Sequence, residues 1–532
     1  MRRFLTALAV LSTFPAAAQV FRPEPIRAHM TFLASDLLEG RGTGTRGHQL
    51  AADYVAAQFE AYGLAPNPAG SYFQSVPFLK TLVQADSTMT VQRGRQAATT
   101  VPLGSTFMTS GNPLAGSSTI KGDVVFAGYG ITAAGSSYDD YKGLDVRGKI
   151  VLLFSGAPAS FANTLRAHYS SSLSKIENAA SHGAIGIVFV SSPDEYARVP
   201  WDRVVRQTKL GAMHWLNAAG QPHGVFSAIP MTVSLSRPGA EALFAGSRQT
   251  YARASEALVA GKARRGPLGV HVMFDIRSVH ARVESPNVVG VIRGSDSKLR
   301  DEYVVISSHL DHLGISDPVN GDAINNGALD NATGIAIILE IARALVTSNP
   351  RRSIVFVATT GEEKGLRGAD YYANNPTVPS QSIVANVNID EVYLFAPSRD
   401  ITVIGAENSD LGATAERAAA AMGIELSPDP FPEEVVFVRS DQYPFVRRGI
   451  PAIFPIAGNR AADGKTDLRA LQAAWNRTRY HQPGDDMNQP LDYRPGVQMA
   501  EFGTRVVLDI ANREGRPQWN KGNFFGELFG RR

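Results

Sequence analysis

The sequence of 532 residues contains no cysteine. This absence excludes disulfide bonds, thiol nucleophiles and zinc sites built on thiolates. Any metal ion must therefore be held by histidine, aspartate and glutamate side chains. Long apolar runs are also missing, because no stretch after residue 18 has the roughly 18–20 consecutive apolar residues that spanning a bilayer requires.

Excess charge of one sign is small, with a formal net charge of +3. A balance this close to neutral gives no reason to expect nucleic acid as a partner. Hydrophobic residues make up 44% and charged residues 19%, which is typical of a folded globular protein. The length predicts two domains, because a single hydrophobic core rarely extends over so many residues.

The first 18 residues are typical of a cleavable signal peptide. Arg2 and Arg3 provide positive charge, residues 4–12 form a short apolar stretch, and residues 16–18 offer an A-x-A cleavage site before Gln19. We therefore expect export to the periplasm or the extracellular space. The sequence leaves the oligomeric state open.

The chain after residue 18 divides into three parts. Residues 19–104 carry helical apolar spacing at 25–38 and 47–62, with a glycine-rich loop between them. That loop lacks the Gly-Lys-Ser/Thr ending of a phosphate cradle, which favours an ordinary flexible loop. Residues 105–262 are expected to form an inserted β-rich domain with short strands at 123–130, 149–154 and 184–190, left through a linker at 261–267.

From residue 263 to residue 532 strands and helices alternate. Strands are expected at 287–292, 303–307, 353–358, 383–389, 401–404 and 452–456, and helices at 335–345, 411–422 and 497–510. This alternation predicts an α/β fold with a mostly parallel central sheet and helices on both faces. Ligands of such sheets bind beyond the carboxyl ends of the strands.

Acidic and histidine side chains follow three of these strands or precede a helix. Each has an ordinary explanation alone, since a His-x-Asp pair is common on surfaces and an aspartate often caps a helix. Together they meet at one rim of the sheet, where metal ions would neutralise the carboxylates. Mixed imidazole and carboxylate ligands suit zinc, cobalt or manganese better than magnesium or calcium. The residues are His309, Asp311, Asp330, Glu362, Glu363 and Asp390.

The nucleophile is expected to be water, because the sequence has neither a Gly-x-Ser-x-Gly motif nor a cysteine. The helical His-Glu-x-x-His motif of many zinc proteases is absent too. His309 and Asp311 are two residues apart in an extended segment and share a face, so the carboxylate can hold the imidazole of a metal ligand.

Five motifs in order resemble the signature of the M28 family of dizinc aminopeptidases. Residues 105–262 resemble a protease-associated (PA) domain, an insertion common among family members, and the remaining resemblance covers 25–100 and 270–513. The M28 motifs are residues 309–311 (HLD), 328–334 (ALDNATG), 361–365 (GEEKG), 388–390 (NID) and 480–483 (YHQP).

The resemblance implies a site with two Zn²⁺ ions. Asp330 would bridge both ions, His309 and Asp390 would hold one, and Glu363 and His481 would hold the other. The implied activity is the removal of N-terminal residues from peptides, which makes peptides the expected substrates.

Further roles are implied by the same resemblance. Asp311 would orient His309, and Glu362 would be the general base that acts on the water between the metals. The peptide bond between Asp330 and Asn331 would be cis.

Alternatives remain open. The protein could be a carboxypeptidase or dipeptidase of the same fold, a one-zinc glutaminyl cyclase, which the complete ligand set disfavours, or a noncatalytic PA-bearing binding protein. Gln442 stands where the family commonly has histidine, and Asp441 either contacts substrate or, as favoured here, caps a helix. Tyr480 either stabilises an oxyanion or packs, and His312 is expected to be structural.

Overall fold

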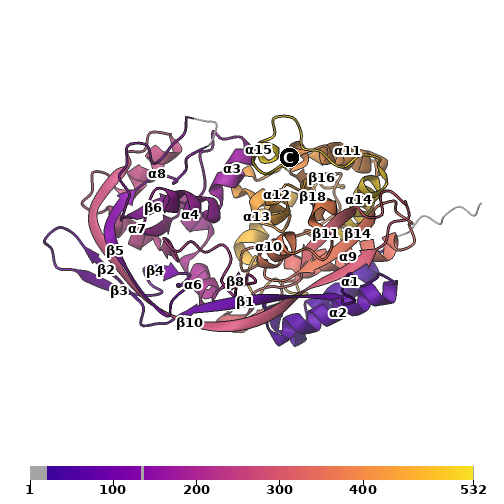
Figure 1. The fold of residues 1–532 in the computed structure, drawn as a ribbon, viewed down its shortest axis with the longest axis horizontal. Coiled ribbons are helices and arrows are strands. Elements are labelled where there is room, and N and C mark those ends of the chain that lie inside the picture. The colour runs from indigo at the N-terminus through magenta and orange to yellow at the C-terminus, as the bar shows by residue number, and fades with distance from the viewer. Residues whose placement is uncertain (1–20, 134–136, 531–532) are drawn as a thin grey trace, which may run out of the picture.

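A single long strand, β10 (Gly266–Ile292), runs through both lobes of the molecule (Figure 1). The computed structural model describes residues 21–133 and 137–530, so the expected signal peptide lies outside the described residues. β10 belongs to a 16-stranded sheet and pairs along 278–288 with β1 (Phe73–Val83). The expected linker at 261–267 is short, because β10 already begins at Gly266. We call residues 84–277 the inserted lobe and the remaining described residues the α/β lobe.

The sheet of the α/β lobe has the strand order β17-β16-β18-β15-β11-β14-β10. Four neighbouring strands, β18, β15, β11 and β14, are parallel, whereas β10 and β16 run antiparallel to β14 and β18. The residues of β11, β14 and β15 are all buried, which explains their continuous apolar pattern. The bounds are β11 (Tyr303–His309), β14 (Ser353–Thr359), β15 (Ile383–Asn388), β16 (Asp400–Ile404), β17 (Glu425–Ser427) and β18 (Ala452–Ala457).

Helices cover both faces of this sheet, which confirms the predicted α/β class. On one face, the largest core is built with α1 (Pro23–Leu33), α2 (Arg46–Tyr62), α9 (Thr333–Leu345), α11 (Leu411–Ala421) and α14 (Arg494–Asn512). The other face is covered by α10 (Arg367–Asn374) and α12 (Gln442–Arg447). The expected strand at 287–292 is the end of β10, and the other five expected strands match within two residues at each end.

The helix expected at 25–38 ends earlier, at Leu33. Residues 36–41 form a tight turn in which Glu39 and Gly40 have φ of 52° and 68°, outside the helical range. The glycine-rich loop that follows is packed rather than flexible. A Cβ at Gly47 would lie 1.7 Å from the carbonyl oxygen of Leu38, so only glycine fits at that position.

The inserted lobe continues the same sheet beyond β10, with the strand order β5-β6-β7-β9-β4. The strands expected at 149–154 and 184–190 are confirmed within two residues, whereas the one expected at 123–130 begins earlier, at Ser117, and ends at Phe126. The boundaries predicted at 105 and 262 stay a prediction. Its strands are β4 (Phe107–Thr109), β5 (Ser117–Phe126), β6 (Ile150–Phe154), β7 (Gly186–Val190) and β9 (Thr232–Leu235), with β2 (Thr88–Gln92), β3 (Thr99–Pro102) and β8 (Ala212–Trp215) beside them. Its helices are α3 (Asn163–Ser170), α4 (Ser172–Ser181), α5 (Pro193–Arg198), α6 (Trp201–Lys209), α7 (Arg237–Phe244) and α8 (Tyr251–Val259).

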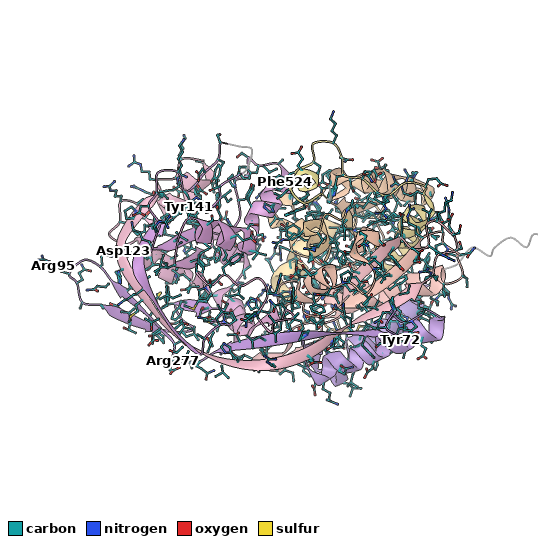
Figure 2. The ribbon with its side chains drawn as sticks, viewed as in Figure 1. Tyr72, Arg95, Asp123, Tyr141, Arg277 and Phe524 are labelled. Carbon is teal, nitrogen blue, oxygen red and sulfur yellow. The ribbon has the colours of Figure 1, made fainter. Side chains whose placement is uncertain are left out.

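The two lobes also meet away from β10. Phe524, labelled in Figure 2, begins α15 (Phe524–Phe529) and packs on His168 of α3 with ring centroids 5.2 Å apart. The α/β lobe further contains α13 (Leu468–Thr478) and a hairpin of β12 (Gly314–Val319) and β13 (Asp322–Asn325). Within residues 21–133 and 137–530, every helix is too short or too polar to cross a membrane.

Candidate metal centre

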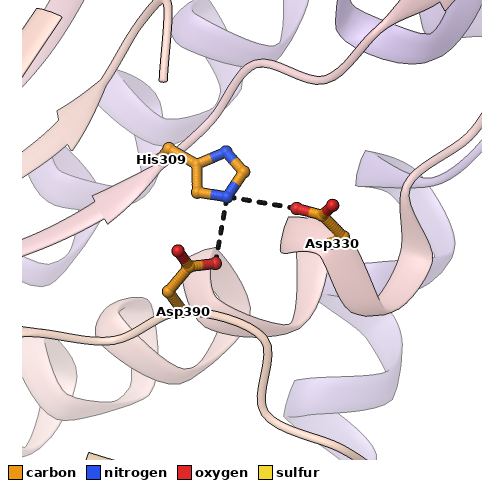
Figure 3. Close-up of side chains that lie close together, drawn as sticks. All are labelled: His309, Asp330 and Asp390. Atoms are coloured by element: carbon orange, nitrogen blue, oxygen red, sulfur yellow. Dashed lines mark hydrogen bonds and ion pairs between the residues drawn. The ribbon is translucent and has the colours of Figure 1, made fainter. Parts of the chain in front are cut away.

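The ends of β11 and β15 and the turn before α9 bring His309, Asp390 and Asp330 together (Figure 3). Nε2 of His309 lies 3.0 Å from Oδ1 of Asp390 and 3.2 Å from Oδ1 of Asp330. All three residues are buried, and one ligand atom of each lies within 4.8 Å of the others. An imidazole and two carboxylates at this spacing can hold a metal ion.

Asp330 faces a second group through its other oxygen. Nε2 of His481 lies 3.1 Å from Oδ2 of Asp330 and 3.1 Å from Oε2 of Glu363. Nδ1 of His312 lies 2.7 Å from Oε1 of Glu363 and 3.8 Å from Oδ2 of Asp330. The structure thus brings all five predicted ligands into one cluster with Asp330 in the middle. That these side chains bind metal stays a prediction.

His312 is the member of this cluster that sequence reasoning did not single out as a ligand. Its side chain is fully buried, and neither ring nitrogen has a hydrogen-bond partner among the described residues. Oε1 of Glu363 and Oδ2 of Asp330 lack one as well. Because Nδ1 and Oε1 are close without hydrogen-bond geometry, both atoms face a shared space, as two ligands of one ion do. The spacing His309-x-x-His312 was the available signal.

The main chain around Asp330 is held by a buried aspartate, Asp485. The backbone N–H groups of Leu329 and Asp330 donate to its carboxylate at 3.0–3.1 Å. The peptide bond between Asp330 and Asn331 is cis, as the resemblance implied. Sequence reasoning missed Asp485, which belongs to none of the motifs.

Asp311 holds His309 by a different atom from the one expected. Nδ1 of His309 lies 3.0 Å from the main-chain oxygen of Asp311. The carboxylate of Asp311 instead accepts from the Thr43 hydroxyl at 2.8 Å and from the Glu362 N–H at 3.1 Å. The expectation of a carboxylate contact to His309 is therefore corrected, because that carboxylate is engaged by the glycine-rich loop and by the loop after β14.

Arg41 of the glycine-rich loop lies fully inside the protein beneath the cluster. Its guanidinium donates to the carbonyl oxygens of Leu310 at 2.9 Å, Asn326 at 2.6 Å and Gly327 at 2.9 Å, and also to that of Leu33. Burial lowers the pKa of Arg41 to about 10, although the carboxylates of the cluster oppose this change. The loop thus fixes two ligand-bearing segments rather than binding phosphate.

Several buried side chains support Asp390, and one of them is Gln442, the residue that departs from the family pattern. The Ser440 hydroxyl donates to Oδ2 of Asp390. The Asn388 amide donates to Ser440 Oγ at 2.7 Å and to Gln442 Oε1 at 3.1 Å. Gln442 is therefore a buried member of the network behind Asp390.

Asp441 stands at the N-cap position of α12, but its side chain makes no capping hydrogen bond. It accepts a hydrogen bond from the hydroxyl of Thr359, the last residue of β14. The interpretation as a helix cap was therefore wrong. The ring of Tyr480 stacks on that of His481 with centroids 3.8 Å apart.

Family models match both lobes. The model described as peptidase family M28 matches residues 287–502, which include every residue of the cluster, and the model described as PA domain matches residues 120–228. Residues 287–502 belong to peptidase family M28. The PA domain lies in the inserted lobe, as the resemblance implied.

Relatives of this M28 peptidase cover only parts of it. One, a probable zinc metalloprotease of Leptosphaeria maculans, is 31% identical over 288 residues, which are 48% of this chain and 64% of that protein. Another, from Pyricularia oryzae and of the same description, is 31% identical over 30% of this chain and 33% of its own length. The chain thus spans less than two thirds of these relatives.

A solved structure shares the fold of the whole M28 peptidase. The aminopeptidase from Aneurinibacillus sp. strain AM-1 superposes over 93% of this chain and 95% of its own, with a TM-score of 0.52 and 18% sequence identity. At this identity the likeness shows the fold alone.

The two adjacent glutamates of the M28 site have opposite electrostatic environments. Burial, with the charges of Glu363, Asp390 and Asp441, raises the pKa of Glu362 well above its usual value, although His309 opposes this. Burial acts in the same direction on Glu363, but the facing imidazoles, foremost that of His481, outweigh it and lower the pKa to about 2. A pair of carboxyl groups separated in this way is typical of an acid–base residue beside a permanently charged one.

The pKa values of the imidazoles reflect an excess of negative charge in the cluster. Burial alone would lower the pKa of His309, but the carboxylates of Asp390 and Glu362 outweigh it and raise the pKa well above its usual value. The pKa of His481 rises to about 10 because Glu363 and Asp330 likewise outweigh burial. The cluster therefore needs cationic charge, from protons on the imidazoles or from metal ions.

A cavity of about 250 Å³ lies between the lobes beside Glu363. Glu363 and Lys364 line it from the α/β lobe, and the other lining residues belong to the PA-bearing lobe. The lining residues from that lobe are Met108, Thr109, Ser110, Gln207, Thr208, Gly211, Ala212, Thr232 and Ser234.

Proposed function

We propose that this M28 peptidase is an exported zinc aminopeptidase that hydrolyses the first peptide bond of peptide substrates. The observation that carries the proposal is the pair of ligand groups that share Asp330. A carboxylate placed between two groups of ligands is suited to a two-metal hydrolase. The relatives described as zinc metalloproteases support zinc, and the structural neighbour is an aminopeptidase.

The donor set fits two Zn²⁺ ions. Buried carboxylate oxygens and imidazole nitrogens without hydrogen-bond partners among the described residues would each gain a partner in a metal ion. Bound zinc polarises a carbonyl group and lowers the pKa of water. The residues that would hold the ions are His309, Asp330 and Asp390 for the first and Asp330, Glu363 and His481 for the second, where His312 offers a further nitrogen.

Glu362 is the proposed general base. It adjoins the ligand Glu363 but belongs to neither ligand group. Its raised pKa suits a carboxylate that takes the proton of the attacking water and passes it to the nitrogen of the departing amine as the C–N bond breaks. Asp311 would keep this residue in place through the Glu362 N–H.

A second candidate, a dipeptidase or carboxypeptidase, is favoured by Lys364. This basic residue lines the cavity beside Glu363, together with hydroxyl-bearing residues such as Thr109 and Ser110. A free substrate carboxylate is a natural partner for such a group. The proposal of an aminopeptidase therefore needs a test of which end of the substrate is recognised.

Peptides with free or blocked ends separate these functions, with zinc measured by mass spectrometry on the same sample. An aminopeptidase cleaves aminoacyl p-nitroanilides and C-terminally amidated peptides but spares N-acetylated ones. A carboxypeptidase does the reverse, and a dipeptidase requires both ends free. Ammonia release from N-terminal glutamine would support the cyclase, and no turnover at full zinc occupancy would support a noncatalytic binding protein.

Export is a separate part of the proposal and rests on residues 1–18. Cleavage after Ala18 would leave Gln19 as the first residue of the mature protein. Intact-mass analysis of the periplasmic and culture fractions should find that N-terminus. Full-length protein confined to the cytoplasm would refute export without affecting the proposed chemistry.

A further inference from the structure

Helix α6 of the inserted lobe presents one face to the α/β lobe. Arg203 and Gln207 are four residues apart and therefore lie on the same side of this helix. The buried guanidinium of Arg203 donates to the main-chain oxygens of Arg477 at 2.7 Å and Asn476 at 3.4 Å. These carbonyls belong to the last turn of α13, where a cation is favoured. This contact docks α6 on the segment that leads directly to His481.

Gln207 contacts the histidine of that segment directly. The side-chain amide nitrogen of Gln207 lies 3.0 Å from Nδ1 of His481, across 274 positions of sequence. The other ring nitrogen, Nε2, faces the carboxylates of Asp330 and Glu363. When Nε2 is a metal ligand, the neutral ring carries its proton on Nδ1 and needs an acceptor there. A rotation of the Gln207 amide by 180° about its Cγ–Cδ bond exchanges the amide nitrogen and oxygen and places the oxygen beside Nδ1.

His481 is the most exposed histidine of the cluster. Its side chain is 17% exposed, whereas those of His309 and His312 are 2% and 0% exposed. His309 is held from behind by the Asp311 carbonyl, within its own strand end. His481 follows the end of α13 in a turn, with a φ of 56°, and Tyr480 stacks on its face. Stacking on one face still allows the ring to flip by 180° about its Cβ–Cγ bond, and a hydrogen bond to the Gln207 amide distinguishes the two orientations.

We propose that Gln207 is a positioning residue for the metal centre, supplied by the inserted lobe. It accepts a hydrogen bond from Nδ1–H of His481 and thereby directs Nε2 at the second metal position, between Asp330 and Glu363. This inference rests on the proposed metal centre. The PA-bearing lobe would then contribute directly to metal binding, in addition to lining the cavity. Without α6, His481 at the second metal position would lose its hydrogen-bond partner.

The test is zinc affinity, measured by competition with a chromophoric chelator on the full chain. Gln207→Leu removes the acceptor at similar volume and should weaken one of the two sites by about 10–100-fold, the usual cost of losing such a partner. The other site should keep its affinity. Gln207→Glu keeps an acceptor oxygen and should restore affinity to within about threefold of the unchanged protein.

The control is Gln249→Leu, the same exchange at a half-buried glutamine of the same lobe whose amide donates to the Arg264 carbonyl at 2.7 Å. It should leave both affinities unchanged. Two tight sites in Gln207→Leu would overturn the proposal, and so would equal losses in Gln207→Leu and Gln207→Glu, which would indicate packing. If Gln207→Leu does not fold, Gln207→Glu alone decides, since weakened binding in that folded variant refutes the role. Absence of zinc from the unchanged protein would instead refute the metal centre itself.

Discussion

Replacing Glu362 by glutamine tests the different roles proposed for two adjacent glutamates. Glutamine has nearly the same shape, but its side chain does not accept a proton at neutral pH. The N–H of residue 362 donates to the Asp311 carboxylate at 3.1 Å, and this main-chain bond survives the exchange. The loop after β14 should therefore keep its shape.

The expected effect on the rate follows from the position of this side chain. Because the Glu362 carboxylate belongs to neither ligand group, zinc content should stay at two ions per chain. Loss of a general base lowers kcat by about 10²–10⁴-fold. This corresponds to about 3–5 kcal/mol of transition-state stabilisation. KM should change little, since the ground-state contacts remain.

The assay is steady-state kinetics on the best substrate of the panel, with zinc measured on the same sample. Glu363→Gln is the matched control, because it makes the same change one residue later in a residue assigned as ligand, and it should lose zinc from one site. A kcat of Glu362→Gln within tenfold of the unchanged enzyme at full zinc would refute the reasoning. Equal loss of zinc from both variants would refute it as well.

Two further predictions concern stability. Arg41→Met removes the donor to several buried carbonyls and should lower the free energy of unfolding by about 3–5 kcal/mol in urea titrations, whereas Arg46→Met, at an exposed ion pair, should change it by less than about 1 kcal/mol. Burial lowers the pKa of His168, which contacts Tyr443 at the lobe interface, to about 4, whereas the unfolded chain binds this proton near pH 6.5. The stability that neutral His168 allows is therefore complete above pH 6.5 and falls as the pH drops toward 4. Between pH 7 and pH 4 the unchanged protein should lose roughly 3 kcal/mol more than His168→Gln, and parallel Tm curves for the two proteins would contradict this.

The ligand-bearing strands could be predicted from the sequence because their signal is local. Strands such as β11 and β14 are short, buried and continuous in apolar residues, and the residues after them meet at one edge of a parallel sheet by geometry alone. This is why His309, Glu363 and Asp390 were found at the same rim. The family motifs added His481, which no strand pattern marks.

The supporting residues could not be predicted in this way. Arg41 lies in a loop whose composition indicates flexibility, and its burial depends on the carbonyl groups of segments nearly 300 residues away. Asp485 and Gln207 act through hydrogen bonds that only the docking of distant elements creates. The Asp311 contact was misjudged for a related reason. Spacing places its carboxylate near His309 but does not say that Thr43 competes for it.

The long strand β10 has a consequence for how large a substrate can reach the cluster. Its 27 residues, roughly 90 Å if straight, pair with β5 in one lobe and with β14 in the other. A change in the angle between the lobes must therefore bend or twist a continuous ladder of main-chain hydrogen bonds, since no flexible linker separates them. The geometry of the sheet therefore sets the width of the cavity beside Glu363. We therefore expect substitutions in β10 far from the cluster to change the width of this cavity.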